Sequence, residues 1–219
     1  NEIAARMNGF KFLVDLFETG DPDYKWPNLD EDDAAVVCYT SGTTGDPKGV
    51  LYSHKSIVVH ANVVSLPDSF CLSATDTVMP VVPMFHVNAW GVPYASAMVG
   101  CRLVLPGPNL DGQSLIELMD QERVTMALAI PTIWEEVLEI LRDTSASLDS
   151  VERILSGGTA VPSWMINEFD QSHGIRLIHG WGMTETSPLG SVNSPLGKHV
   201  ALDGDCLLYT SDAADEWLR

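Results

Sequence analysis

The sequence has few basic residues. Only 12 lysines and arginines stand against 30 aspartates and glutamates, and the formal net charge is -18. Negative charge of this size opposes contact with nucleic-acid phosphates and with anionic membrane surfaces. Long apolar runs are also absent, since none approaches the roughly 20 residues that cross a bilayer. We therefore expect a soluble protein without a nucleic-acid partner and without a membrane span.

Cysteine is sparse and shows no pairing pattern. Cys38, Cys71, Cys101 and Cys206 have no CxxC spacing, and three of them lie in apolar surroundings where a free cysteine packs as a small hydrophobe. This pattern indicates neither a disulfide framework nor a zinc site, and no HExxH segment is present. No basic and apolar leader opens the sequence, which favours a cytoplasmic protein. The first residue is Asn1 and not methionine, so a targeting signal ahead of it stays open.

Short apolar runs alternate with amphipathic stretches along most of the chain. The apolar runs are residues 34–40, 76–83, 101–106, 125–131, 151–158 and 175–182, and the amphipathic stretches are 54–66, 114–124, 132–143 and 161–171. Ser53 and Pro131 are placed to begin two of the helices. The alternation predicts an α/β fold, with mostly parallel sheets covered by helices and a site at the carboxyl ends of the strands.

A glycine-rich loop follows the first apolar run. The segment YTSGTTGDPKG, residues 39–49, surrounds one lysine, Lys48, with glycines and hydroxyl side chains. Backbone amides in such a loop can surround a phosphate, and the lysine adds positive charge. The Walker pattern is excluded because Lys48 follows Pro47 and precedes Gly49. Composition alone leaves an ordinary glycine-rich turn as the alternative.

The loop resembles the phosphate-binding motif of the adenylate-forming superfamily, which includes acyl-CoA synthetases, firefly luciferase and the adenylation domains of peptide synthetases. A second segment, GWGMTETSP (residues 180–188), resembles the aromatic-Gly-x-Thr-Glu signature of that family. The resemblance extends from about Lys25 to Gly204. It is strongest to medium-chain fatty-acid-CoA and methylmercaptopropionate-CoA ligases, through PMFHVNAWG, LVLPGPNLDG and WGMTETSPLG.

The resemblance implies an enzyme that activates a carboxylic acid with ATP. The products of this step are acyl-AMP and pyrophosphate, and the acyl group then passes to CoA. The expected acids are medium-chain fatty acids or short thioether acids, with Mg²⁺ assisting the phosphoryl chemistry. The alternatives are a luciferase-like activity, the acylation of a carrier protein, and a nucleotide-binding or interaction module without catalysis.

The resemblance also implies roles for individual residues. Lys48, Thr184 and Glu185 are the expected catalytic residues: Thr184 at the α-phosphate and Glu185 at a magnesium ion whose oxygen ligands lie at about 2.1 Å. The loop from Thr40 to Lys48 is expected to hold the β- and γ-phosphates. The full expected set for ATP or AMP is Thr40, Ser41, Gly42, Thr43, Thr44, Gly45, Lys48, Gly157, Gly158, Thr159, His179, Gly180, Trp181, Gly182, Met183 and Thr184. Without the family, Gly157 and Gly158 would indicate a tight turn, and Trp181 could equally be core.

The acid is expected at the segment PMFHVNAWG. The resemblance assigns substrate positioning to His86 and the acyl pocket to Trp90, with no acid–base role, and Val87 is expected at the substrate because it is apolar enough to contact an acyl chain. His86 and Trp90 are four residues apart and share a face if the segment is helical. A structural histidine and ordinary core packing are the alternatives on general grounds.

The two ends of the chain differ from its regular middle. Residues 1–33 are expected to be a remnant of the preceding part of the large domain followed by an acidic linker, and residues 34–205 the partial AMP-binding core. Residues 206–219 resemble the translated end of a transposon-derived sequencing adapter, which predicts a non-native tail. The family's ribose-binding aspartate, hinge and small C-terminal domain are expected beyond this chain. We therefore expect the isolated chain to be a poor catalyst, and the sequence predicts no oligomeric state.

Overall fold

The computed structural model describes residues 19–40 and 46–194. Contacts between Cα atoms divide the chain into two units, Asn1–Asp30 and Glu31–Arg219. In the first unit the rings of Tyr24 and Trp26 meet edge to face, with centroids 5.2 Å apart. The predicted loop residues Ser41, Gly42, Thr43, Thr44 and Gly45 lie outside the described residues, as does the predicted tail 206–219.

The second unit alternates strands and helices along the chain. Its strands are β1 (Ala34–Thr40), β2 (Lys48–Ser53), β3 (Thr77–Pro80), β4 (Arg102–Leu103), β5 (Met126–Ala129), β6 (Arg153–Gly157), β7 (Arg176–Gly182) and β8 (Leu189–Val192). Its helices are α2 (His54–Ser65), α3 (Val87–Trp90), α4 (Val92–Val99), α5 (Gly112–Gln121), α6 (Pro131–Asp143), α7 (Ser163–His173) and the short 3-10 turn η2 (Thr184–Thr186).

Six strands form one sheet in the order β4-β3-β5-β6-β7-β8. The first five of these are parallel, and only β8 runs antiparallel to its neighbour β7. Each parallel pair needs a crossover, and the amphipathic stretches between the strands supply the helices for it. The predicted α/β fold with a mostly parallel sheet is therefore confirmed.

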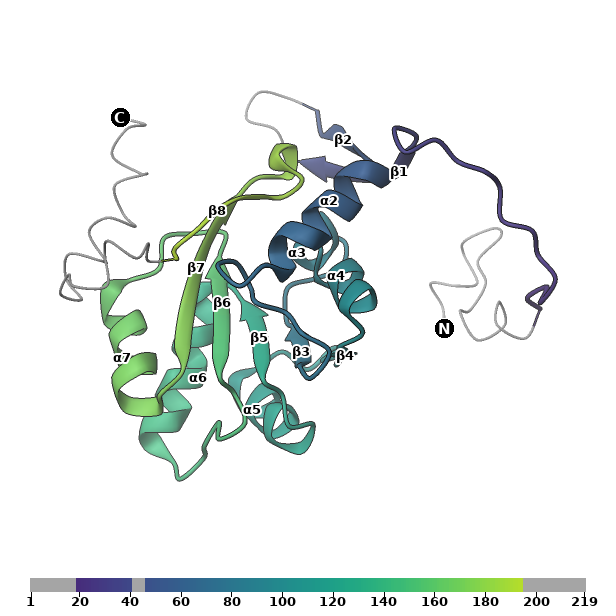
Figure 1. Ribbon diagram of the computed structural model, residues 1–219. Helices are drawn as coiled ribbons and strands as arrows, with labels where there is room; N and C mark the ends of the chain where they lie inside the picture. The colour runs from purple at the N-terminus through teal and green to yellow at the C-terminus, as the bar shows by residue number, and fades with distance from the viewer. Residues whose placement is uncertain (1–18, 41–45, 195–219) are drawn as a thin grey trace, which may run out of the picture. The chain divides into compact units, whose positions relative to one another are not determined.

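Helices cover both faces of this sheet (Figure 1). On one face, α5, α6 and α7 pack against alternate strand residues such as Ala127, Ile154 and Leu177. On the other, α2 and α4 pack against the residues between them, such as Leu155 and Ile178. Strands buried on both faces need apolar side chains at every position, which explains the continuous apolar runs in the sequence.

Local signals set where several helices begin. The hydroxyl of Ser53 accepts a hydrogen bond from the amide of Ser56 at 3.2 Å, which caps α2 as predicted. Pro131 is the first residue of α6, also as predicted, because a helix leaves the first amide free. Asp111 caps α5 by accepting a hydrogen bond from the amide of Ser114 at 3.0 Å.

Strands β1 and β2 form a separate antiparallel ribbon, which sequence alternation did not predict. One face of the ribbon buries Cys38 and Tyr52 with Val87. The opposite face carries the exposed side chains Val37 and Leu51. Thr40 pairs with Lys48, so the glycine-rich loop connects the ends of the two strands.

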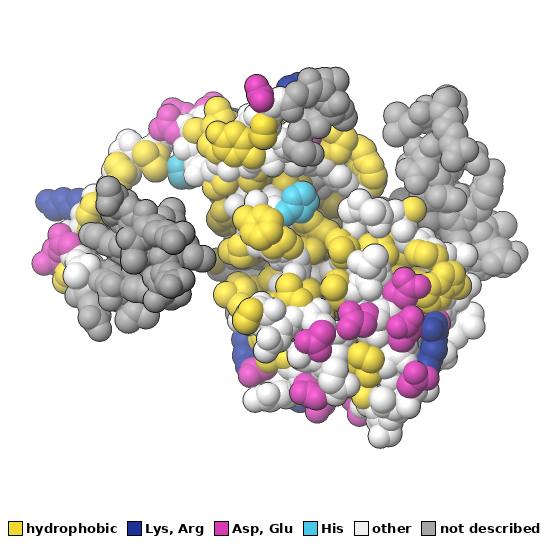
Figure 2. Space-filling model, turned by 180° about the vertical axis from the view of Figure 1, so that it is seen from behind, with side chains coloured by type: hydrophobic (Ala, Val, Ile, Leu, Met, Phe, Trp, Pro, Cys, Tyr) yellow, Lys and Arg dark blue, Asp and Glu magenta, His cyan; other side chains and the backbone are white. Residues whose placement is uncertain are grey.

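Acidic and apolar side chains occupy different parts of the surface. Figure 2 shows hydrophobic side chains gathered in the middle of one face, around a histidine, with acidic side chains below them. In the described part of the chain, no helix is long and apolar enough to cross a membrane.

Candidate active site

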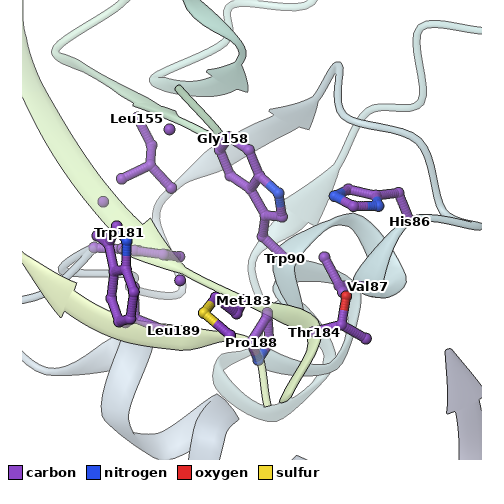
Figure 3. A pocket seen from close by; sticks show the side chains of 14 residues that line it. His86, Val87, Trp90, Leu155, Gly158, Trp181, Met183, Thr184, Pro188 and Leu189 are labelled. Carbon is purple, nitrogen blue, oxygen red and sulfur yellow. The ribbon is translucent and has the colours of Figure 1, made fainter. Parts of the chain in front are cut away.

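A cavity of about 270 Å³ lies where β6 and β7 end (Figure 3). These parallel strands are in register, with Gly157 opposite Gly180, so the two glycine-rich segments that follow them reach the same edge of the sheet. The residues that line the cavity are Phe70, His86, Val87, Trp90, Leu155, Gly157, Gly158, Gly180, Trp181, Gly182, Met183, Thr184, Pro188 and Leu189. A site at the carboxyl ends of parallel strands is the position that the fold favours for a ligand.

The structure brings three predicted segments together in this cavity. The lining residues that the sequence singled out are His86, Val87, Trp90, Gly157, Gly158, Gly180, Trp181, Gly182, Met183 and Thr184. Other predicted residues that the structure describes lie outside the lining: Thr40, Lys48, Thr159, His179 and Glu185. The cavity therefore unites the second signature with the PMFHVNAWG segment, which lies about 90 residues earlier in the chain.

Close backbone approach explains the glycine at the end of β6. A side chain at Gly157 would place its Cβ 2.5 Å from the carbonyl oxygen of Gly180 and 3.7 Å from the indole of Trp90. Trp90 thus reaches the end of β6, and Figure 3 shows its ring directed toward Leu155 and Gly158. The absence of a side chain at Gly157 therefore allows the backbones of β6 and β7 to approach closely.

Trp181 forms another wall of the cavity. Its indole packs on β8, where a Cβ at Gly190 would lie 2.4 Å from the ring. The side chain is 44% exposed, so Trp181 is not a core residue. An indole held against the sheet, with part of its surface exposed, can stack on an aromatic ring of a ligand.

The segment that carries His86 and Trp90 does not form the right-handed helix that their spacing allows. Residues Val87–Trp90 have φ values of 42°, 55°, 50° and 55°, and Gly91 follows with φ 73°. The backbone therefore makes a left-handed turn, which is rare for residues other than glycine. His86 and Trp90 nevertheless line the same cavity, with His86 largely exposed.

A hydrogen bond connects the ribbon to the second signature. The hydroxyl of Tyr52 on β2 donates to the carbonyl oxygen of Thr184 at 2.6 Å, and both residues are buried. Burial raises the pKa of Tyr52 far above its usual value, and the charges of Cys38 and Glu185 raise it further.

The described residues contain no group of three or more histidine, cysteine, aspartate or glutamate side chains that could hold a metal ion by themselves. Glu185 is exposed at the start of η2. A single carboxylate suits a magnesium ion that takes most of its ligands from phosphates and water.

Sequence reasoning missed several residues of the cavity. Phe70, Leu155, Pro188 and Leu189 line it without belonging to any predicted site. Pro188 is the last residue of the second signature and Leu189 directly follows it, so their positions in the sequence were a usable signal. Phe70 and Leu155 are ordinary apolar residues, and only the tertiary structure places them at the site.

Residues 3–206 match the sequence profile described as AMP-binding enzyme. The chain therefore belongs to this family. It is similar to the medium-chain-fatty-acid–CoA ligase of Ectopseudomonas oleovorans, with 52% identity over 202 residues that cover 92% of this chain and 37% of that protein. It is also similar to the 3-methylmercaptopropionyl-CoA ligase of Ruegeria pomeroyi, with 53% identity over 199 residues that cover 91% of this chain and 37% of that protein. The chain thus spans little more than a third of these relatives.

Solved structures share the fold. The inhibitor-bound N-terminal domain of FACL13 from Mycobacterium tuberculosis matches with a TM-score of 0.74 and 27% identity, over 83% of this chain and 44% of that one. The anthranilate CoA ligase AuaEII, solved with anthranoyl-AMP, matches with a TM-score of 0.75 and 21% identity, over 86% of this chain and 37% of that one. The described fold is that of the N-terminal domain of adenylate-forming CoA ligases.

Proposed function

We propose that this chain is the partial core of an ATP-dependent acid–CoA ligase. The observation that carries the proposal is one cavity that joins Gly157 and Gly158 with residues of GWGMTETSP and PMFHVNAWG. The two relatives named above, with more than half of their aligned residues identical, are CoA ligases and support the same reaction. The full-length enzyme would convert a carboxylic acid, ATP and CoA into acyl-CoA, AMP and pyrophosphate.

We assign the nucleotide to the side of the cavity formed by the ends of β6 and β7. The exposed indole of Trp181 offers a stacking surface for adenine, and Gly157 and Gly158 allow close approach of the backbone. Thr159 and His179 flank these residues in the sequence and would complete the adenine side. The acid is assigned to the side formed by His86, Val87 and Trp90, where apolar and aromatic groups predominate.

We assign the phosphates to the space between η2 and the end of the ribbon. The hydrogen bond from Tyr52 to Thr184 ties these two elements together, and Lys48 begins the second strand of the ribbon. Thr40 and the loop residues Ser41–Gly45 would supply further donors. Glu185 would be the protein ligand of Mg²⁺, which when bound offsets phosphate charge.

The residues divide the chemistry between orientation and charge stabilisation. A carboxylate oxygen attacks the α-phosphorus, the bond to the bridging oxygen breaks, and pyrophosphate leaves. Thr184 would donate to the α-phosphate and Lys48 would stabilise the charge that grows on the departing oxygens. The thiol of CoA then attacks the acyl carbon, loses its proton and displaces AMP.

The substrate class rests on the relatives and on the apolar acid side. Medium-chain fatty acids and short thioether acids are our proposed substrates, because the names of the two relatives given above specify such acids. The cytoplasmic location stays a prediction. The division of the sequence into residues 1–33, 34–205 and 206–219 also stays a prediction.

The test is ATP–pyrophosphate exchange by the full-length protein, with straight-chain and thioether acids, each with and without Mg²⁺. We expect exchange that requires both an acid and Mg²⁺, and formation of acyl-CoA when CoA is added. Exchange without transfer to CoA would favour a carrier-protein or luciferase-like activity. A folded full-length protein that catalyses no exchange with any acid would contradict the proposal and favour a binding module.

A further inference from the structure

The left-handed turn at Val87–Gly91 is a strained part of the cavity wall. Four consecutive residues other than glycine have positive φ, and the first is the β-branched Val87. Such a conformation persists only where surrounding groups hold it. Val87 and Trp90 line the cavity, so whatever holds the turn also sets the shape of the wall.

His60 on α2 packs directly against the end of this turn. A Cβ at Gly91 would lie 2.5 Å from Nδ1 and 2.6 Å from Cε1 of the imidazole, so only glycine fits beside the ring. The ring therefore occupies the space that a side chain at residue 91 would need. The backbone of Gly91 is itself left-handed, with φ 73°. A weaker contact lies nearby, where the thiol of Cys38 donates to Oδ1 of Asn88 at 3.5 Å.

The imidazole of His60 is buried, and one of its two nitrogens is unpaired within the part of the chain that the structure describes. The residue is 8% exposed, and its Nε2 is buried without a hydrogen-bond partner among the described residues. It faces a second, very small cavity that lies behind the turn and is lined by Tyr52, Ile57, His60, Val87, Asn88, Gly91, Tyr94, Ser187 and Pro188. None of these lining residues carries a formal charge at neutral pH.

The two cavities share part of their walls. Val87 and Pro188 line both, whereas His60 lines only the small one. His60 therefore lies one layer behind the acid side of the candidate site, and no atom of it borders the larger cavity. This position suits a residue that acts through its neighbours.

We propose that His60 is a positioning residue that holds the Val87–Gly91 turn left-handed and so determines which acids fit the site. The proposal rests on the proposed function for its second half, the choice of acid. The first half, the geometry of the turn, is independent of any activity. The ring acts by its shape, and its polar atoms play no part in the chemistry.

The kinetic arm uses the full-length protein and four variants. For His60→Ala we expect the KM of the preferred acid to rise about tenfold and the preference between short and long acids to change, with the KM of ATP unchanged within about twofold. His60→Phe keeps a ring at this position and should preserve the acid profile. Gly91→Ala should raise the KM of the acid, because the added Cβ clashes with the ring of His60. The double variant with His60→Ala has no such clash, so its KM should be no higher than that of Gly91→Ala alone.

Leu138→Ala is the matched control, because Leu138 is fully buried on α6 in the cluster on the opposite face of the sheet. It should lower thermal stability by a similar or larger amount without changing the acid profile. If His60→Ala behaves like Leu138→Ala, with lower stability and an unchanged acid preference, the choice of acid does not depend on His60 and the proposal is overturned.

The structural arm compares crystal structures of the wild-type and His60→Ala proteins. We expect the wild type to keep positive φ at Val87–Trp90 and the variant to lose it or to show Trp90 displaced. An unchanged turn in His60→Ala overturns the proposal even if the kinetics change. This arm remains decisive if the wild type shows no acid-dependent exchange, so failure of the proposed function is distinguished from failure of this inference.

Discussion

The two ends of the parallel strands differ in what lies there: a charged network of hydrogen bonds at the amino ends and a cavity at the carboxyl ends. At the amino ends, Arg153 donates to Asp76 at 2.7 Å and to the carbonyl oxygen of Phe70 at 3.0 Å. Asp76 also accepts hydrogen bonds from Thr125 at 2.7 Å and from the amide of Ser73 at 2.8 Å. Such a network joins β3, β5 and β6 and leaves the buried carboxylate fully paired.

At the carboxyl ends, the same strands lead into a cavity, a left-handed turn and unpaired polar atoms. The hydroxyl of Ser156 and Nε2 of His60 are buried without partners among the described residues, as are the hydroxyls of Ser69 and Ser150 near the amino-end network. Polar groups left unpaired in a protein interior lower stability, and they are found where function demands them. What distinguishes the two ends is therefore the charged network at one and the cavity with its left-handed turn at the other.

The largest expected effect is the loss of stability when the hydrogen-bond network at the amino ends of the strands is broken. Arg153→Ala leaves the carboxylate of Asp76 buried without its partner, so we expect the free energy of unfolding to fall by about 3–5 kcal/mol. Denaturant unfolding of the full-length protein measures this. Arg102→Ala is the control, because Arg102 makes an exposed ion pair with Glu122 and should lose less than about 1 kcal/mol. Equal losses for the two variants would mean that the network does not stabilise the fold.

The second prediction concerns how the free energy of unfolding depends on pH through His60, which lies near the carboxyl ends of the strands. Burial lowers the pKa of His60 to about 4, whereas an unfolded histidine titrates near pH 6.5. Between these values the unfolded state binds more protons, so the free energy of unfolding falls as the pH drops from about 6.5 to about 4, by about 3 kcal/mol. Burial also raises the pKa of Tyr52 and Tyr94, which line the same small cavity, so both stay neutral throughout.

Denaturant unfolding across this pH range, with His60→Phe beside the wild type, measures the effect. The variant should lose most of the dependence between pH 6.5 and 4. Asp76 acts at lower pH: burial raises its pKa, but hydrogen bonds from Arg153 and Thr125 outweigh burial and place the pKa below its usual value. Its stabilising contribution is therefore lost only as the pH falls below about 4. Identical pH profiles for wild type and His60→Phe would show that His60 is not buried in its neutral form.

The third prediction separates catalysis from stability. Lys48 is exposed at the start of β2, so Lys48→Ala should leave the free energy of unfolding within about 0.5 kcal/mol of the wild type. The rate of pyrophosphate exchange should fall about 100-fold, because a charge near the departing phosphates is lost. Lys55→Ala removes another exposed lysine, paired with Glu31, and should change neither quantity. A rate for Lys48→Ala within twofold of wild type would remove this residue from the site.

The smallest expected effect is at the link between the ribbon and the second signature. Tyr52→Phe removes the hydrogen bond to Thr184 and should lower the free energy of unfolding by about 1 kcal/mol. The KM of ATP should rise several-fold if the proposed site is correct, because Thr184 is no longer held to the ribbon whose strands the glycine-rich loop connects. Tyr24→Phe, at an exposed tyrosine of the first unit, is the control. A normal KM for ATP in Tyr52→Phe would mean that this hydrogen bond serves stability alone.

Sequence reasoning succeeded where local chemistry decides the structure. Continuous apolar runs indicated buried parallel strands, and Ser53 and Pro131 marked two helix starts correctly. It missed β2, α4 and β8, because elements of only four to eight residues show weak periodicity. The spacing of His86 and Trp90 suggested a common helix face, yet the backbone there is left-handed, since packing against His60 overrides local preference.

The sequence by itself determined the family, the α/β class and the segments that form the candidate site, because those properties depend on local motifs and on the order of apolar runs. Only the tertiary structure decided that Trp181 is exposed at the cavity wall, that Tyr52 holds Thr184, and that His60 lies behind the acid side. These contacts join residues distant in the chain, and they arise from crossover packing and from close backbone approach at glycines. Neither the crossover packing nor the close backbone approach can be read from the spacing of residues in the sequence.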